Sequence, residues 1–230
     1  MNENLDELLI FAAIRGDMAV IESSISQGAN VNALSKGSMT ALMMAAGEGY
    51  LNVVDFLLEH GADVNARNDS NYTALMYAVE SNYPYVIDAL LEKGADINGD
   101  NNYRENVLMS VSRKGYAEYI KAFIERGIDV NVGNYIGDTA LHIAADNGQS
   151  DAIKVLIECG ANINATNVVG WTPLMLAAVR GHGASVALLL ENNADVNLRN
   201  DYGSTALTEA RKIVGSAAIV ELLKRAGAVE

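Results

Sequence analysis

The sequence predicts an all-α fold, a solenoid of seven helix-turn-helix units, and three observations carry this prediction. A run resembling Gly-Ala-Asp/Asn closes successive apolar segments at Gly28, Gly61, Gly94, Gly127, Gly160, Asn193 and Gly227. Five of the six intervals between these positions are 33 residues long, and the last is 34. Apolar residues within the intervals follow helical spacing. A fixed period of this length is typical of helical repeats, in which each unit buries its apolar face against its neighbours.

The second unit, residues 34–66, shows the elements in order. Thr40 precedes an apolar run and is expected to cap a helix of about two turns that begins at the next residue. Glu48-Gly49-Tyr50 breaks this helix. Leu51–His60 then has apolar residues at i, i+1, i+4 and i+5, the spacing of one buried helix face, and Gly61 ends the second helix.

The same positions recur in the other units with substitutions that obey backbone rules. The helix-capping position holds Thr40, Thr73, Asn106, Thr139, Thr172 and Thr205. The turn between the two helices holds Gly16, Gly49, Asn82, Gly115, Gly148 and Gly181, and Pro84 suits the first position of the helix that follows Asn82. In the return segment, a recurring Asn is expected to bond its own backbone and hold an irregular turn: Asn32, Asn65, Asn98, Asn131, Asn164 and Asn197.

These motifs resemble the ankyrin repeat family. The resemblance is carried by Thr172-Pro173-Leu174-Met175 with Gly181-His182, and by Thr139-Ala140-Leu141-His142 with Gly148, and it covers about residues 5–230. It implies helix pairs joined by β-hairpin-like loops. We expect a single domain, residues 1–230, with units at about 1–33 (N-terminal cap), 34–66, 67–99, 100–132, 133–165, 166–198 and 199–230 (C-terminal cap).

The sequence departs from the family pattern at two positions of the repeat, in some units but not in all. The family usually has His three residues after the cap, but here only His142 keeps it, so weaker hydrogen bonding between loops is expected where Met stands, at Met43, Met76, Met109 and Met175. We assign these Met side chains, with Met44, to the core. The hairpin-tip glycine survives as Gly137, Gly170 and Gly203 but is replaced by Ser38, Asn71 and Arg104, so these three turns are expected to differ in shape.

The last unit departs from the pattern as well. It has one extra residue between Ala210 and Ala218. Its helices carry charged side chains that suit a polar terminal cap: Glu209, Arg211, Lys212, Glu221 and Lys224.

Charge and targeting signals narrow the possible partners and locations. The net charge of −13 argues against binding to nucleic acid or to an anionic membrane. Residues 1–99 hold 14 acidic and 4 basic side chains, so a basic partner is expected to approach that half. The acidic start does not resemble a signal peptide, and a single cysteine, Cys159, suits a reducing compartment. We expect a cytoplasmic protein, and delivery into a host cell stays open.

No recognised motif for catalysis or for a cofactor is present in the sequence. It contains no GxSxG, HExxH, GxGxxG or P-loop pattern. His60, His142 and His182 lie in different units, and the acids near Asp63 and Asp100 lack the order of an EF-hand loop. We therefore expect no enzyme activity, no cofactor and no metal site.

The hairpin tips are the candidate binding site. From the fourth unit onward they become apolar and aromatic, and Trp, Tyr and Arg most often carry binding energy. The alternative is that neighbouring tips pack these side chains on one another. The predicted partner-binding residues are Tyr72, Tyr103, Arg104, Tyr135, Ile136, Val168, Val169, Trp171 and Tyr202.

The resemblance implies a non-enzymatic module that binds a partner protein on its concave face and tips. One alternative is an inhibitor or immunity-type protein that blocks a basic enzyme or toxin. This alternative draws on the acidic charge and on the bacterial style of the Thr-Ala-Leu-Met motifs. A second alternative is a self-assembling scaffold, although we expect a monomer. The sequence does not specify the partner's identity, because this fold serves unrelated functions and the specificity of each protein lies in its tips.

Overall fold

The computed structural model describes residues 3–229, and within this range it contains fourteen helices and no strand. The helices are α1 (Glu3–Arg15), α2 (Met18–Ser26), α3 (Ala41–Glu48), α4 (Leu51–Glu59), α5 (Ala74–Ser81), α6 (Pro84–Glu92), α7 (Val107–Lys114), α8 (Ala117–Glu125), α9 (Ala140–Asp146), α10 (Ser150–Glu158), α11 (Pro173–Val179), α12 (Gly183–Glu191), α13 (Ala206–Ala210) and α14 (Ala217–Arg225). The all-α repeat fold predicted from the sequence is confirmed.

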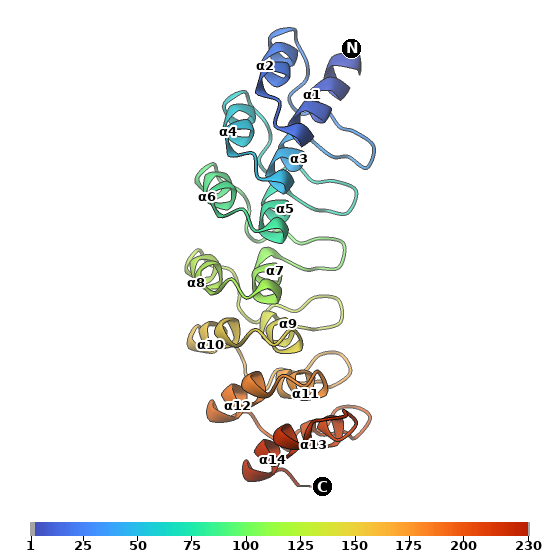
Figure 1. Ribbon diagram of the computed structural model, residues 1–230, viewed down its shortest axis with the longest axis vertical. Helices are drawn as coiled ribbons and strands as arrows, with labels where there is room; N and C mark the ends of the chain where they lie inside the picture. The colour runs from blue at the N-terminus through green and yellow to red at the C-terminus, as the bar shows by residue number, and fades with distance from the viewer. Residues whose placement is uncertain (1–2, 230) are drawn as a thin grey trace. The chain divides into compact units, whose positions relative to one another are not determined.

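The chain divides into two compact units, unit 1 (Met1–Asn102) and unit 2 (Tyr103–Glu230). Within each unit, the first helices of successive repeats stack on one another, and the second helices stack beside them. Figure 1 shows these two columns, for example α3 and α5 beside α4 and α6 in unit 1. The prediction of one continuous domain over residues 1–230 stays a prediction.

The predicted caps begin the first helix of each repeat from α3 onward. The Thr40 hydroxyl accepts the backbone N–H of Met43 at 3.2 Å, and the Asn106 amide oxygen accepts that of Met109 at 3.1 Å. Thr139 and Thr205 form capping boxes with the residue three positions later. These side chains satisfy helix N–H groups that have no partner in the preceding turn, which fixes where each helix begins.

Several inter-helix glycines are needed both for backbone conformation and for space. Gly49 has φ +79°, in the left-handed region, and a Cβ there would lie 2.5 Å from the Tyr83 ring of the next repeat. Gly148 has φ +69°, and a Cβ there would lie 2.7 Å from the His182 ring. In both cases the residue before the second helix covers the glycine one repeat earlier, which holds consecutive repeats of one unit in register.

The core of each unit is formed by the two stacks of helices. Met43, Met76, Met109 and Met175 are at most 3 % exposed, which confirms their assignment to the core, whereas Met44 is half-buried. The second helices bury one face, as Val53, Val54 and Leu57 do in α4. A close approach of neighbouring helices is made possible by the fully buried Ala45 and Ala46 of α3.

The role predicted for the return-segment Asn was wrong. Its side chain does not hold its own turn but reaches the next repeat: Asn32 Nδ2 donates to Gly61 O at 3.0 Å, and Asn32 Oδ1 accepts Asp63 N at 2.8 Å. The residue two positions earlier holds the turn, as Asp63 Oδ1 does by accepting Asn65 N at 2.9 Å. An amide side chain both donates and accepts, so it can bond a backbone C=O and a backbone N–H of another loop. A carboxylate only accepts and cannot bond the C=O.

Two of the three substituted tips do not differ in the way expected. Asn71 and Arg104 adopt φ +62° and +57°, close to the +74° to +77° of Gly137, Gly170 and Gly203. Side chains therefore occupy the same left-handed position that glycine occupies elsewhere, at a cost of about 1 kcal/mol for a residue such as arginine. Ser38 has φ +59°, but the residue before it, Gly37, is also left-handed at φ +82°, so this tip alone differs.

The C-terminal repeat carries its extra residue in the turn between α13 and α14, where Val214 is fully exposed. Its polar cap was predicted only in part. Arg211, Lys212, Glu221 and Lys224 are exposed, but Glu209 is only 4 % exposed, and its carboxylate accepts Lys212 Nζ at 2.6 Å. A carboxylate with a lysine partner three residues away can be buried at a helix surface at lower cost than an unpaired one.

Candidate functional site

Three hairpin tips of unit 2 are each held by an asparagine at the base. Asn134 Oδ1 accepts the backbone N–H groups of Ile136 and Asp138 at 3.1 and 3.0 Å. Asn167 does the same for Val169 and Trp171, and Asn200 for Tyr202 and Ser204. Each tip also closes with a backbone bond, as between Asn134 N and Asp138 O. The tips are thus ordered by their own hydrogen bonds, before any partner binds.

Neighbouring tips are also bonded to one another. Three backbone bonds join four successive tips: Tyr135 N to Tyr103 O at 3.2 Å, Val168 N to Ile136 O at 2.9 Å, and Asp201 N to Val169 O at 3.1 Å. The spacing between the tip side chains is therefore set by main-chain geometry, not by the side chains themselves.

His142 adds a second link between two of these tips. Its Nδ1 accepts the backbone N–H of Thr139 at 3.2 Å, so the proton lies on Nε2, which donates to Trp171 O at 3.0 Å. Burial lowers the pKa of His142, although nearby Asp138 opposes this effect. The imidazole is therefore neutral near pH 7, in the form these two bonds require.

The exposed tip residues of unit 2 form what we call the tip surface: Tyr103, Arg104, Tyr135, Ile136, Val168 and Tyr202. Four of these side chains are more than 60 % exposed, from 64 % for Val168 to 75 % for Tyr202. The Arg104 guanidinium carbon lies 5.9 Å from the centre of the Tyr135 ring. A cavity of about 270 Å³ lies between the first two tips and is lined by Tyr103, Glu105, Asn134, Tyr135 and Ile136.

Three predicted site residues lie elsewhere or deeper. Val169 and Trp171 are half-buried at the base of their tip, where the Trp171 backbone is held by Asn167 and His142. Tyr72 is half-buried in unit 1, with its ring centre 5.5 Å from that of Tyr77, so it packs within its own unit. Exposure can differ between adjacent residues of a tip, as between Val168 and Val169, and sequence composition alone does not reveal this.

All three histidines make contacts within the fold. His182 Nε2 lies 3.0 Å from Asp146 O, and the His60 ring stacks on Phe56. Across residues 3–229 no three His, Cys, Asp or Glu side chains converge as metal ligands would. In the same range no helix combines the length and apolar character that crossing a membrane requires.

Comparisons with known proteins agree with this architecture. The family model described as "Ankyrin repeats (3 copies)" matches residues 9–101 and 99–167, and that described as "Ankyrin repeats (many copies)" matches residues 156–210. The crystal structure of the human ASB11 ankyrin repeat domain is similar, with a TM-score of 0.84 and 25 % identity over 96 % of this chain and 98 % of that chain. No curated protein matches the sequence.

Ankyrin repeats are generally protein–protein interaction modules, and the fold is typically non-enzymatic. The family models cover most of the sequence, and the caps, left-handed glycines and loop-bridging asparagines recur at the period they describe. The chain therefore belongs to the ankyrin repeat family.

Proposed function

We propose that this protein is a non-enzymatic module that binds a partner protein through the tip surface of unit 2. The observation that carries the proposal is the row of exposed Tyr, Ile and Val side chains on four successive tips whose backbones are already bonded together. Exposed aromatic and aliphatic residues gathered on a soluble protein usually mark an interaction site. Ordered tips also reduce the entropy lost on binding.

Tyrosine and arginine are well suited to anchor such a partner. A tyrosine offers a large apolar surface and a hydroxyl with few rotatable bonds, and truncating an anchoring residue typically costs about 2 kcal/mol or more. The cavity beside Tyr103, Tyr135 and Ile136 could receive one apolar side chain of the partner. We therefore assign the main anchors to this part of the tip surface.

Unit 1 is proposed to steer the partner by its charge. Its sequence holds 15 acidic and 4 basic side chains, a net charge of −11. A field of this sign speeds the approach of a basic protein, which favours the sharper version of the proposal, an inhibitor or immunity-type protein that blocks a basic enzyme or toxin. In that case the association rate falls steeply as salt is raised. An association rate independent of salt would contradict the inhibitor version and leave tip binding intact.

The remaining alternative is a self-assembling scaffold, in which the tip surface meets another copy of the chain. We propose instead a monomer, because the net charge of −13 makes like chains repel. The single cysteine suits a reducing compartment and supports a location in the cytoplasm. Light scattering over a dilution series distinguishes these states, since only a self-assembling protein changes its average mass with concentration.

Affinity purification with matched variants tests the proposal. Wild-type protein, the Tyr135→Ala, Tyr202→Ala variant and the Tyr85→Ala control are used as baits in lysate of the source cells, and captured proteins are identified by mass spectrometry. Tyr85 lies on α6 and is 76 % exposed, almost the same as Tyr202, but it is far along the sequence from any tip. We expect a protein captured by wild type and by the control but not by the double variant. Equal capture by all three would contradict the tip surface.

A further inference from the structure

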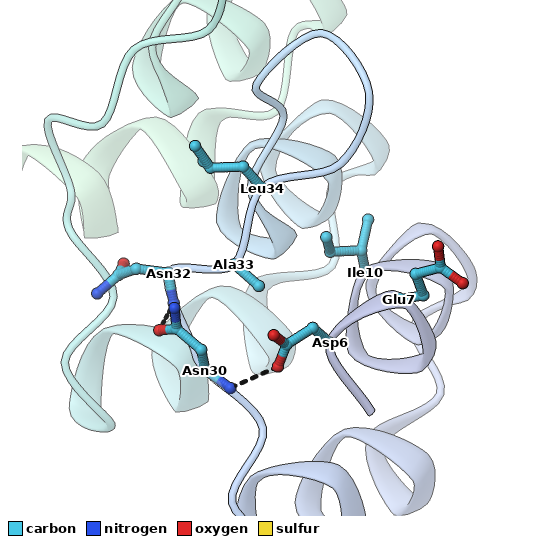
Figure 2. A pocket seen from close by; sticks show the side chains of 7 residues that line it. All are labelled: Asp6, Glu7, Ile10, Asn30, Asn32, Ala33 and Leu34. Carbon is cyan, nitrogen blue, oxygen red and sulfur yellow. Dashed lines mark hydrogen bonds between the residues drawn. The ribbon is translucent and has the colours of Figure 1, made fainter. Parts of the chain in front are cut away.

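A second surface lies beside α1 and belongs to unit 1. With 13 residues, α1 is longer than the other first helices of the described repeats, which have 5 to 8. Figure 2 shows α1 beside the segment that contains Asn30, Ala33 and Leu34, with Asp6 pointing toward Asn30 and Glu7 pointing away from the segment. A cavity of about 470 Å³ lies between them. A second cavity of about 430 Å³ shares Glu7, Ile10 and Leu34 and extends to Phe11, Lys36 and Met44. We call the two together the α1 hollow.

The floor of the α1 hollow is apolar and its walls are exposed. Ile10 and Ala33 are 5 % and 7 % exposed, whereas Phe11 and Leu34 are 62 % and 61 % exposed. The repeat itself does not require an apolar residue at the position of Leu34, because the equivalent positions hold Arg67, Asp100, Gly133, Thr166 and Arg199. An exposed leucine at this position contributes little to the stability of unit 1. It would bury more apolar surface by contact with a partner.

Carboxylates border the same apolar walls. One oxygen of Asp6 accepts the backbone N–H of Asn30 at 2.7 Å, which fixes the side chain at the edge of the cavity. Glu7 is exposed and, among residues 3–229, forms no hydrogen bond or ion pair. Lys36 is the one cation among the described residues that line the hollow. Within a unit of net charge −11, this surface favours a positive side chain.

We propose that the α1 hollow docks a segment of a partner protein in which an arginine or lysine stands between aliphatic residues. The aliphatic side chains would cover Ile10, Phe11 and Leu34, and the cation would pair with Glu7 at the rim. A cavity of this size accepts a few side chains, and a charge at its polar edge supplies orientation. An acidic or phosphorylated segment would be repelled by the same carboxylates. The proposal is independent of the tip surface, which lies in unit 2.

Three capped tripeptides test this chemistry on the full-length protein by methyl-detected NMR. The probes are acetyl-Leu-Arg-Leu-amide, acetyl-Leu-Glu-Leu-amide and acetyl-Ser-Arg-Ser-amide, and the readout is the shift of the Ile10, Ile14, Leu34 and Met44 methyl signals during titration. We expect the Leu-Arg-Leu peptide to shift these signals and to bind about fivefold tighter than either other peptide, because each of those lacks one of the two required features. Comparable shifts with Leu-Glu-Leu, or unchanged methyl signals with all three, would overturn the proposal.

Variants then locate the contacts. Glu7→Gln should remove most of the preference for Leu-Arg-Leu over Leu-Glu-Leu, and Leu34→Ser should weaken both peptides, while the remaining methyl spectrum shows that the fold is kept. The matched control is Glu22→Gln, which removes an exposed carboxylate of α2 outside the hollow and should leave binding unchanged. An equal effect of Glu7→Gln and Glu22→Gln would reduce the preference to general charge and overturn the site.

Two further results distinguish this proposal from self-association and from binding at the tip surface. If the same methyl signals move with protein concentration in the absence of peptide, the occupant is a second copy of the chain, and the proposal fails. The Tyr135→Ala, Tyr202→Ala variant should bind Leu-Arg-Leu as wild type does. A failure at the α1 hollow therefore leaves tip binding untouched, and loss of partner capture through the tips leaves the α1 hollow untouched.

Discussion

The hairpin tips of unit 1 and unit 2 share one backbone design but present opposite surfaces. In unit 1, Asn68 accepts the N–H groups of Ser70 and Tyr72, as Asn134 does for its tip in unit 2, and Asp69 N bonds to Gly37 O as Val168 N bonds to Ile136 O. The unit 1 side chains are polar and satisfy one another, since Ser38 Oγ donates to Asp69. The unit 2 tips instead expose aromatic and aliphatic side chains, Tyr103, Tyr135, Ile136, Val168 and Tyr202 among them. Main-chain hydrogen bonds therefore stabilise the tip in both units, and the exposed side chains can differ to suit a partner.

Transferring one unit 1 tip to unit 2 should have the largest effect on binding. Asp69 and Ser70 occupy the positions of Tyr135 and Ile136 two repeat periods earlier in the sequence, so Tyr135→Asp, Ile136→Ser exchanges the surface and keeps the backbone. We expect affinity for the captured partner to fall about 100-fold, or about 3 kcal/mol, as for loss of two anchors. Calorimetric titration measures the affinity. Urea unfolding should change by less than about 0.5 kcal/mol, because both side chains are exposed. A large loss of stability would show that these side chains pack the tips instead.

Replacing a tip glycine of unit 2 by alanine should lower the free energy of unfolding by an amount that depends on which tip is changed. Gly170→Ala places a Cβ 2.9 Å from Asn200 Cα of the next tip at φ +76°, whereas Gly203→Ala at φ +74° meets nothing within 4 Å. We expect urea unfolding to show a loss of about 3 kcal/mol for the first and about 1 kcal/mol for the second, since only the first adds a steric clash to the backbone strain. Equal losses would mean that the tips can move apart freely.

His142 stands at a repeat position that methionine occupies in unit 1, and its hydrogen bonds should contribute to the free energy of unfolding. His142→Met removes the bonds to Thr139 and to Trp171 O and should cost about 2 kcal/mol at pH 7.5 in urea unfolding. Met43 and Met76 fill this position in unit 1 and are buried, so the side chain itself should fit.

The same variant has a pH dependence with a defined sign. Because folding lowers the pKa of His142, the unfolded chain takes up a proton first as pH falls. The contribution of His142 is therefore complete above about pH 6.5 and shrinks below it, by up to about 1.4 kcal/mol per pH unit. The stability difference between wild type and His142→Met should be smaller at pH 5.5 than at pH 7.5. A difference that grows on acidification would indicate that the buried imidazole is charged.

Arg104→Asn should give the smallest effect. It relieves a left-handed arginine at φ +57°, as Asn71 already does at φ +62° in unit 1, and should stabilise the protein by up to about 1 kcal/mol. The same change removes the guanidinium 5.9 Å from the Tyr135 ring, which should weaken partner binding by about 0.5 kcal/mol. Unchanged stability would show that arginine adopts this conformation without strain.

Most of the fold could be predicted from the sequence because its rules are local. A left-handed residue, a capping hydroxyl and a helix breaker each depend on their own backbone, so Thr40, Gly61 and Pro84 could be placed by spacing alone. The asparagine bridges could not, because Asn32 bonds to a loop 29 residues away.

The site was only partly predictable for the same reason. Composition identified the tips of unit 2, and Tyr103, Tyr135, Ile136, Val168 and Tyr202 are indeed exposed. Which residues pack is decided by neighbours, so Trp171 and Tyr72 were placed on the surface although both are half-buried. The α1 hollow was missed altogether, since an exposed Leu34 beside Phe11 looks in the sequence like an ordinary apolar pair of a core.

Site-specific photo-crosslinking can show whether a partner contacts the tip surface in the cell. A benzophenone amino acid is incorporated at Tyr135, Tyr202 or Tyr85, which are 65 %, 75 % and 76 % exposed, and the protein is irradiated in its source cells. We expect the same partner to be crosslinked from positions 135 and 202 and not from position 85. Crosslinking from position 85 alone, or equally from all three positions, would contradict a partner held by the tip surface.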